Sequence, residues 1–195
     1  MTARTETRDR ILRVGAEIIH RRGFNNTGIQ EILRAAEVPK GSFYFYFRSK
    51  NDFGLRLVDY YEGYLLRRLD AHLAKTELSP LARLRGFFEE FRLAFEGDQC
   101  RGGCPVGNLA QEMGDLDETF RLRLNQVFEA LRERIAAALQ QADQQLELPA
   151  GVEATDLAGF ILNSWQGAIL HMKVAKSIAP LESFERIIFD SLLDA

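Results

Sequence analysis

The eight residues from Lys40 to Phe47 carry side chains suited to contact with nucleic acid: an ammonium group, hydroxyls and several aromatic rings. In a helix, Phe43 and Phe47 lie four residues apart on one face, where they can anchor a core. The outer face would then carry Lys40, Ser42, Tyr44 and Tyr46. A short helix with an aromatic root and a basic, hydroxyl-bearing outer surface fits the second helix of a helix-turn-helix. The alternative is a buried aromatic helix with no special role.

Two cysteines suggest a second kind of chemistry. Cys100 and Cys104 lie in a glycine-rich stretch, and Cys104 comes directly before Pro105, which is well placed as the first residue of a helix. The helix dipole and its N–H groups, with Arg101 close in sequence, would favour a thiolate at Cys104. Cys104 could then sense electrophiles or oxidants, with Cys100 as the resolving thiol. The alternative is a small, half-buried residue that lines the loop.

Three later helices offer side chains for an apolar ligand cavity with a few polar groups. The candidates are Phe91, Phe95, Phe128, Asn163, Trp165 and His171. Aromatic stripes at helical spacing are usually ordinary core, which is the alternative for each phenylalanine. Residues 157–172 are apolar nearly all round and should be buried on most sides. Gly159, Asn163, Gly167 and His171 recur there every four residues, and for His171 the alternative is a satisfied core or interface histidine.

The charge distribution indicates that residues 1–50, called the head below, could bind nucleic acid, whereas residues 51–195, the body, are acidic. The whole chain has a net charge of −3, which alone would argue against a nucleic-acid binder. Residues 1–50, however, hold ten Lys and Arg against five Asp and Glu, a net charge of +5, whereas residues 51–195 carry −8. The head alone is therefore expected to meet phosphates.

The sequence shows no targeting or membrane segment. Residues 1–10 are too polar for a signal peptide, and the uncharged stretch 157–172 is shorter than the roughly 20 residues that span a bilayer. Two cysteines do not make a disulfide framework, and two thiols without clustered His fall short of the four ligands of a zinc site. We expect a protein of the reducing cytoplasm that has no metal and no cofactor.

Helical periodicity covers nearly the whole chain and strand patterns are almost absent, which predicts an all-α fold of about nine helices. The expected helices are 5–22, one that opens at Thr27, 40–47, 50–73, 80–97, 105–114, 117–145, 153–176 and 180–193. Thr27 and Gln30 have the spacing of a capping box, and Ser49 is the expected cap of the long helix that follows. The boundary is expected near residue 50, between a DNA-binding domain at 1–50 and an effector-binding and dimerisation domain at 51–195.

About forty residues of the head carry a more specific pattern. In order, they are Ile11-Leu12, Arg22-Gly23-Phe24, Thr27, Ile29-Gln30-Glu31-Ile32, Ala35-Ala36-Glu37-Val38, Lys40-Gly41-Ser42-Phe43-Tyr44-Phe45-Tyr46-Phe47 and Ser49-Lys50. This constellation resembles the DNA-binding domain of the tetracycline-repressor (TetR) family. The resemblance implies a three-helix helix-turn-helix head, an all-helical regulatory body and a homodimer whose two heads bind one DNA operator. One departure is Gly15, which replaces an Ala and weakens the first helix unless close packing needs it.

The resemblance also implies roles for individual residues of the head. Lys40 and Lys50 would contact phosphates, Thr27 would add a hydroxyl or backbone contact, and Gln30 could reach a base or the backbone. Gly41 would let the backbone approach the DNA closely. The candidates for base edges or thymine methyls are Ser42, Tyr44 and Phe45. Tyr46 stands where the family often has a His or Tyr that contacts phosphate.

The complete hypothesis is a ligand-responsive regulator, a repressor of transcription. The last two helices would form the dimer interface, and binding of an unknown effector would shift helices five to seven and tilt the fourth, which changes the distance between the two recognition helices. Two alternatives stay open: a thiol-dependent enzyme with Cys104 as nucleophile, and a helical carrier or interaction module with no DNA role.

Overall fold

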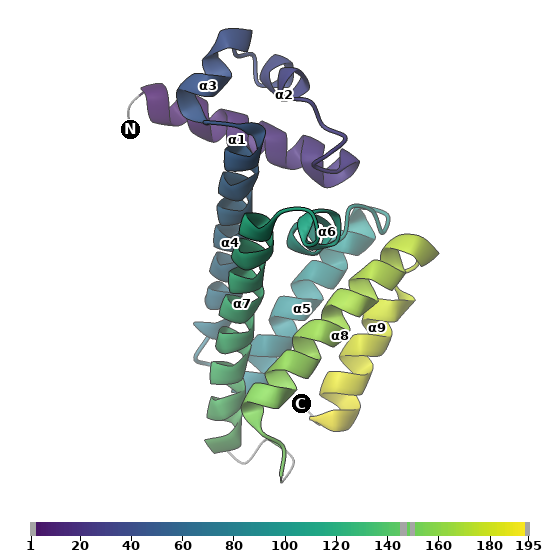
Figure 1. Ribbon diagram of the computed structural model, residues 1–195. Helices are drawn as coiled ribbons and strands as arrows, with labels where there is room; N and C mark the ends of the chain where they lie inside the picture. The colour runs from purple at the N-terminus through teal and green to yellow at the C-terminus, as the bar shows by residue number, and fades with distance from the viewer. Residues whose placement is uncertain (1–2, 145–147, 149–150, 194–195) are drawn as a thin grey trace. The chain divides into compact units, whose positions relative to one another are not determined.

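The computed structural model describes residues 3–144, 148 and 151–193, and in that part of the chain the regular secondary structure is helical (Figure 1). Its helices are α1 (Ala3–Arg22), α2 (Ile29–Ala35), α3 (Phe43–Tyr46), α4 (Lys50–Leu73), α5 (Pro80–Gly97), α6 (Pro105–Met113), α7 (Glu118–Gln144), α8 (Ala154–Ala175) and α9 (Ala179–Glu185). A 3-10 turn, Lys40–Ser42, leads into α3, and a π-helical stretch, Arg186–Leu192, follows α9. The predicted all-α class is confirmed.

The chain divides into two compact units. The first comprises Met1–Gly63 and Pro105–Asn125, and the second comprises Tyr64–Cys104 and Gln126–Ala195. Both α4 and α7 therefore contribute to each unit, and α6 belongs to the first. The first unit thus includes residues 51–63 and Pro105–Asn125 in addition to residues 1–50.

An aromatic cluster forms the centre of the helix-turn-helix in the first unit. Phe43, Phe47 and Phe53 are each at most 2% exposed. The ring centroids of Phe43 and Phe47 lie 5.2 Å apart, and Phe47 meets Phe53 edge-on at 5.0 Å. Phe43 and Phe47 thus form the buried side of this segment, as their spacing predicted. Four aliphatic side chains of the same unit are also at most 1% exposed: Ile11, Ile32, Leu33 and Leu57.

Several predicted helix ends agree with the structure, and one does not. The Ser49 hydroxyl accepts a hydrogen bond from the Asp52 amide at 3.0 Å, so Ser49 caps α4 as predicted. Ser79 caps α5 in the same way, with the Ala82 amide at 3.2 Å. The prediction of a capping box at Thr27 was wrong. The N-cap residue of α2 is Gly28, which provides no side-chain cap. The Thr27 hydroxyl instead donates a hydrogen bond to the Gly23 carbonyl at 2.7 Å.

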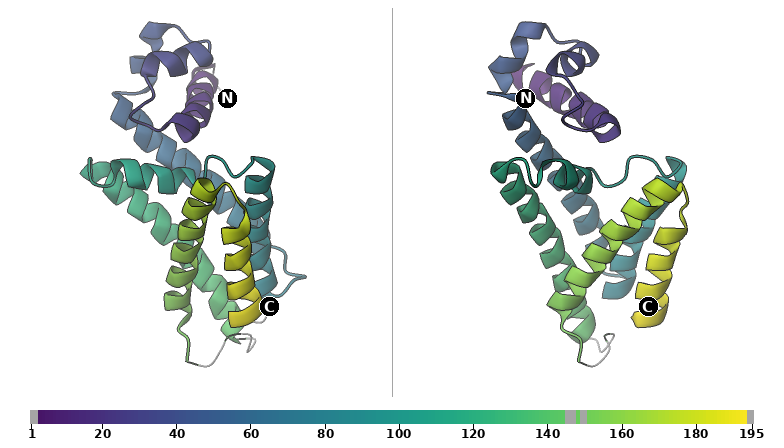
Figure 2. Two further views of the ribbon diagram at one scale, coloured as in Figure 1. Left: turned by 90° about the vertical axis from the view of Figure 1, so that its right-hand side faces the viewer. Right: turned by 45° about the vertical axis from the view of Figure 1, so that its right-hand side comes forward.

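Aromatic side chains also join the helices of the second unit. The rings of Phe88, Trp165 and Phe184 come from α5, α8 and α9, and each pair of centroids lies between 5.0 and 5.1 Å apart. Helices α8 and α9 run side by side (Figure 2). Arg92 of α5 donates to Glu185 of α9 at 2.9 Å. Burial raises the pKa of the Glu185 carboxyl, and Arg92 partly opposes that rise.

The last helix differs from the prediction of one regular helix over 180–193. The α-helical part ends at Glu185, and the chain continues in the wider π-helical form to Leu192. Much of the apolar face expected to meet a partner instead belongs to the chain's own core. Leu181, Phe184 and Ile188 are at most 6% exposed. Ile187 and Leu192 are the members of that face that remain open, at 57% and 40% exposed.

Two glycines of the first unit are required by close packing. A Cβ atom at Gly15 would lie 2.5 Å from the Phe53 ring, which is the packing reason for a glycine in α1. A Cβ atom at Gly54 would lie 2.5 Å from Phe120 and 2.6 Å from Phe24. Both contacts are shorter than real side chains allow, so neither position can hold a larger residue without local movement.

Gly54→Ala should destabilise the protein by about 1–3 kcal/mol, the usual cost of overpacking a filled core. Thermal unfolding followed by circular dichroism should show a melting temperature lower by several degrees. Gly97→Ala is the matched control, because Gly97 is the last residue of α5 and nothing lies within 4 Å of an added Cβ. Equal melting temperatures for the two variants would contradict this account of Gly54.

Candidate functional sites

The segment from Lys40 to Phe45 presents large aromatic side chains on its outer surface. Tyr44 is 68% exposed and Phe45 is 61% exposed, whereas the neighbouring Phe43 is fully buried. Lys40 and Gly41 are also exposed. Exposed aromatic surface next to a cation is typical of a surface that binds a macromolecule.

The backbone of this segment is shorter and tighter than one continuous helix over 40–47. The Ser42 amide donates to the Pro39 carbonyl at 2.9 Å and forms the 3-10 turn, and α3 then makes little more than one turn to Tyr46. Ser42 and Tyr46 are half-buried. The ring of Tyr46 meets that of Phe45 edge-on at 5.3 Å. The outer surface is therefore formed mainly by Lys40, Tyr44 and Phe45.

The other candidate DNA contacts lie in different surroundings. Gln30 is exposed on α2, a helix whose buried side is formed by Ile32 and Leu33. Thr27 is 1% exposed, and its hydroxyl is already bonded to the Gly23 carbonyl. The Lys50 ammonium lies 4.8 Å from the centre of the Phe24 ring and donates to the Asn25 carbonyl at 3.4 Å. Burial lowers the pKa of Lys50, and the nearby charge of Glu112 opposes that shift.

Glu112 of α6 takes part in the head, which the sequence did not indicate. Its two carboxylate oxygens accept hydrogen bonds from the Phe24 amide at 2.7 Å and the Asn25 amide at 2.6 Å. These groups are 88 and 87 residues apart in sequence, so no local pattern could have revealed the contact. Phe24 and Phe120 also pack together, with ring centroids 5.3 Å apart.

Both candidate sensor thiols are buried. Cys100 and Cys104 are each 7% exposed, and Cys104 directly precedes α6, as predicted. Gln166 of α8, which was not among the predicted site residues, donates through Nε2 to the Cys104 sulfur at 3.5 Å. The backbone of Cys100 has a positive φ of 55°, so the loop makes a sharp turn there.

The candidate effector residues differ in how far they are exposed. Trp165 is buried among aromatic rings, while Phe91, Phe95 and Phe128 are half-buried. The ring centroid of Phe91 lies 6.4 Å from that of Phe95 and 5.1 Å from that of Phe87, so α5 carries a continuous aromatic stripe. The side chains of Asn163 and His171 are exposed on α8. In the single chain, these two polar groups therefore lie outside the apolar core.

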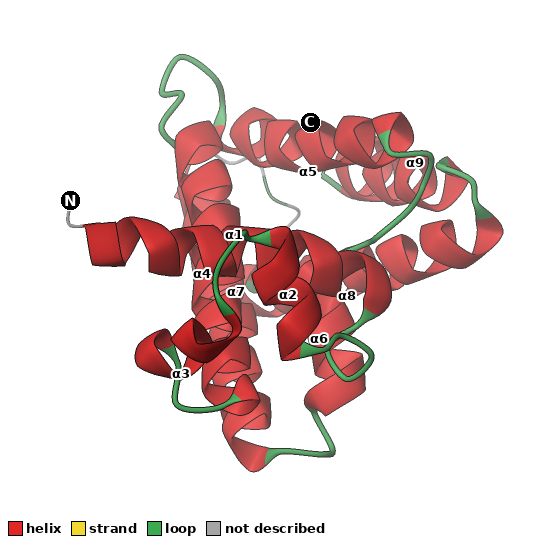
Figure 3. Ribbon diagram, turned by 90° about the horizontal axis from the view of Figure 1, so that it is seen from above, coloured by secondary structure: helices red, strands yellow, loops and turns green. Residues whose placement is uncertain are grey.

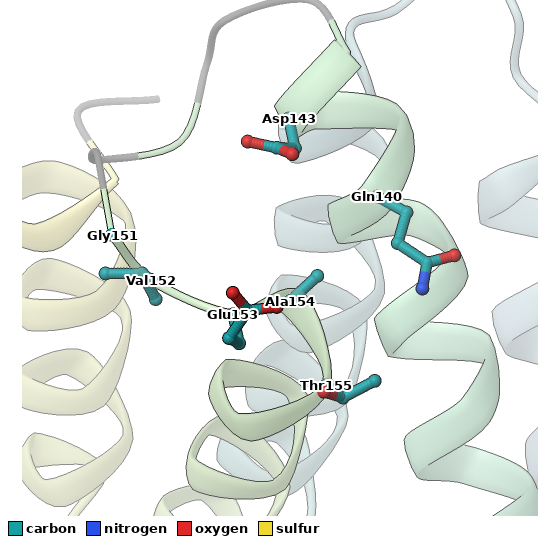
Figure 4. Close-up of a pocket in the computed structure, with 7 residues that line it drawn as sticks. All are labelled: Gln140, Asp143, Gly151, Val152, Glu153, Ala154 and Thr155. Atoms are coloured by element: carbon teal, nitrogen blue, oxygen red, sulfur yellow. The ribbon is translucent and has the colours of Figure 1, made fainter.

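A cavity of about 260 Å³ lies between the end of α7 and the start of α8 (Figure 4). Its lining residues are Gln140, Asp143, Gly151, Val152, Glu153, Ala154 and Thr155. The lining is polar, and it includes none of the residues predicted to bind an effector. A site for an apolar ligand would instead need a mostly apolar lining.

The described residues offer neither a metal cluster nor a membrane span. In that part of the chain, no cluster of three or more His, Cys, Asp or Glu could hold a metal ion. None of the described helices combines the length and apolar character that crossing a membrane requires. Seen from above, the described part of the chain consists of helices and loops (Figure 3).

Family models match both parts of the chain. Residues 11–56 match the model for bacterial regulatory proteins of the tetR family, and residues 80–188 match the tetracyclin repressor-like C-terminal domain. The chain belongs to the TetR family. It is a DNA-binding transcriptional regulator and not an enzyme, because its relatives are regulators of transcription.

Individual relatives are similar over nearly the whole regulator. The transcriptional regulator AcuR of Cereibacter sphaeroides is 44% identical over 179 residues, which cover 90% of this chain and 80% of AcuR. The transcriptional repressor DhaR of Mycobacterium sp. strain GP1 is 31% identical over 98% of this chain and 94% of its own length.

Solved structures agree with these sequence relationships. The regulatory protein TetR from Rhodobacter sphaeroides has a TM-score of 0.86 at 42% identity, over 91% of this chain and 94% of its own. The reduced form of Escherichia coli NemR has a TM-score of 0.82 at 29% identity, over 94% of this chain and 96% of its own. The helical architecture is thus that of the family.

Lys40→Ala should weaken DNA binding and make it less sensitive to salt. If Lys40 neutralises one phosphate, its loss should reduce the slope of log affinity against log salt by about 0.9. Gel-shift titrations at several salt concentrations measure that slope. Arg67→Ala, which removes an exposed cation of α4 in the second unit, should leave it unchanged. An unaltered slope for Lys40→Ala would count against a phosphate contact at this position.

Proposed function

We propose that this regulator is a homodimeric repressor that occupies a palindromic operator and leaves it when a small effector or a thiol-reactive compound binds. The observation that carries the DNA-binding part is the exposure of Tyr44 and Phe45, at 68% and 61%, beside Lys40. Their ring faces and the Tyr44 hydroxyl can reach base edges and thymine methyls, while Lys40 neutralises a phosphate. The proposed contact is completed by Ser42, Tyr46, Gly41 and Gln30.

A dimer would present this surface twice. Two recognition helices of a two-fold dimer enter major grooves about 34 Å apart, so the operator should be a palindrome. The proposed interface is formed by α8 and the chain from α9 to Leu192. Apolar side chains left open there are Phe160, Leu170, Val174, Ile187 and Leu192, which are 40–76% exposed.

The spacing on α8 supports one continuous contact face. Phe160, Asn163, Gly167, Leu170 and Val174 recur at intervals of three and four residues, so they lie along one side of the helix. Nothing lies within 4 Å of a Cβ added at Gly167, which leaves room for close approach of a second helix. Packing against the same face of a partner would cover both stripes and form a four-helix contact. Asn163 and His171 would then lie at the interface and not in a ligand cavity.

The effector response is proposed to involve the loop around Cys104 and the aromatic stripe of α5. An amide N–H directed at sulfur stabilises a thiolate, and Gln166 supplies one to Cys104. The solved NemR structure is described as a reduced form, which supports redox chemistry in a relative of this chain. Cys100 is the proposed resolving thiol, and Phe91, Phe95, Phe128 and Trp165 are the proposed apolar contacts of an effector. The reducing cytoplasm is the proposed location.

Selection of bound sequences from random DNA tests the proposal as a whole. The wild-type protein should enrich a palindrome with half-sites about one helical turn apart or multiples of that spacing. Val174→Glu, which places a charge in the proposed interface, should sediment as a monomer and enrich single half-sites weakly. Leu122→Glu, at a leucine of α7 that is 50% exposed, is the matched control. Recovery of no common sequence by the wild-type protein would refute specific operator binding.

Treatment with N-ethylmaleimide should release DNA from the wild-type protein and from Cys100→Ala, but not from Cys104→Ala. The thiol adduct must displace Gln166 and expand the loop, and allosteric coupling of this kind typically changes affinity by about 5–150-fold. Gel shifts before and after treatment measure the change, and mass spectrometry identifies the modified thiol. Equal release from Cys104→Ala would end the thiol-sensor hypothesis and leave a non-covalent effector.

A further inference from the structure

We propose that Glu112 and Lys50 are positioning residues for DNA binding, which together clamp the turn between α1 and α2. This turn comprises residues 23–26 and precedes the first helix of the helix-turn-helix. The proposal rests on the DNA-binding function above, and it concerns how the binding surface is held and not what it touches.

Glu112 holds the N–H groups of the turn. Its Oε2 accepts from the Phe24 amide at 2.7 Å and its Oε1 accepts from the Asn25 amide at 2.6 Å, so one carboxylate binds two successive backbone donors. Hydrogen bonds to a charged acceptor are roughly twice as strong as neutral ones. Gly23 has a φ of +87°, and a Cβ there would lie 3.3 Å from both carboxylate oxygens. The turn is thus shaped to admit this carboxylate closely.

Lys50 holds the other side of the same turn. Its ammonium donates to the Asn25 carbonyl at 3.4 Å and lies 4.8 Å from the centre of the Phe24 ring. The charge of Glu112 raises the pKa of Lys50 against the lowering effect of burial, so the two side chains also attract each other across the turn. Asn25 therefore has its N–H bonded to α6 and its C=O bonded to α4.

The clamp fixes the start of α2 because the short segment between the turn and α2 has little conformational freedom. Thr27 follows the turn, is 1% exposed and is bonded back to the Gly23 carbonyl. Helix α2 then begins at Ile29 and buries Ile32 and Leu33. A turn that is held at both of its polar sides therefore transmits the position of α6 and α4 to the helix-turn-helix.

A positioning role and a phosphate contact predict different salt dependence. Loss of a phosphate contact lowers the slope of log affinity against log salt by about 0.9. Loss of a positioning contact weakens binding by the same factor at every salt concentration, because the number of neutralised phosphates does not change. The slope therefore separates the clamp from the phosphate role first expected of Lys50.

Glu112→Gln keeps the shape of the side chain but replaces one acceptor oxygen by an amide N–H₂, which cannot accept from a backbone N–H. On a duplex recovered by the selection above, this variant should bind about tenfold more weakly with an unchanged salt slope. Hydrogen exchange in the free protein should become faster at the Phe24 and Asn25 amides. Lys50→Met, which keeps a long unbranched side chain but removes the ammonium, should also weaken binding without changing the slope.

Glu118→Gln is the matched control, because Glu118 is an exposed carboxylate of α7 that pairs with its neighbour Arg121. It should leave affinity, slope and exchange at the turn unchanged. If Glu112→Gln kept the wild-type affinity and unchanged amide exchange, the clamp would be overturned. If Lys50→Met reduced the slope of log affinity against log salt, Lys50 would be a phosphate contact instead. If the wild-type protein bound no duplex, the proposed function would fail, and exchange at Phe24 and Asn25 would still decide whether Glu112 holds the turn. If Glu112→Gln did not fold, the affinity and salt slope of Lys50→Met would decide whether Lys50 positions the turn or contacts a phosphate.

Discussion

The packing of Phe43 and Phe47 against Phe53 is the contact on which the DNA-binding head depends. Helix α3 contains only four residues, far fewer than a helix needs to be stable alone in water. Burial of each phenylalanine contributes about 1.5–3 kcal/mol, and the three rings meet at 5.0–5.8 Å. Because neighbouring side chains of a helix point in different directions, the same packing turns Tyr44 and Phe45 outward.

The first compact unit extends the head with residues that are distant in sequence. Helix α6 and the first part of α7 belong to it, and Phe120 packs on Phe24 while Glu112 bonds to the turn before α2. Gly54 allows these rings to approach α4. Since α6 begins directly after Cys104, the chain passes from the thiol loop to the carboxylate that holds the turn within nine residues of helix.

Aromatic packing and ion pairs between helices hold the second unit together. Aromatic rings from α5, α8 and α9 fill its centre, and the Arg85–Asp190 and Arg92–Glu185 ion pairs connect α5 to the last segment of the chain. Once these contacts are made, Leu181, Phe184 and Ile188 have no surface left for a partner. The open stripe of α8, together with Ile187 and Leu192, remains available for contact with a second copy.

Local features of the sequence were enough to establish the family, the all-α class, most helix ends and the aromatic root of α3, because these depend on periodicity, capping side chains and a motif of nearby residues. They predicted the wrong cap for α2, since the Thr27 hydroxyl is turned to Gly23 by burial that no local pattern encodes. The partners of Lys50, the contacts of Glu112 and Gln166, and the exposure of Asn163 and His171 became visible in the folded chain alone. Each of these depends on which distant helix packs alongside, and that arrangement is set by the summed packing of the whole core.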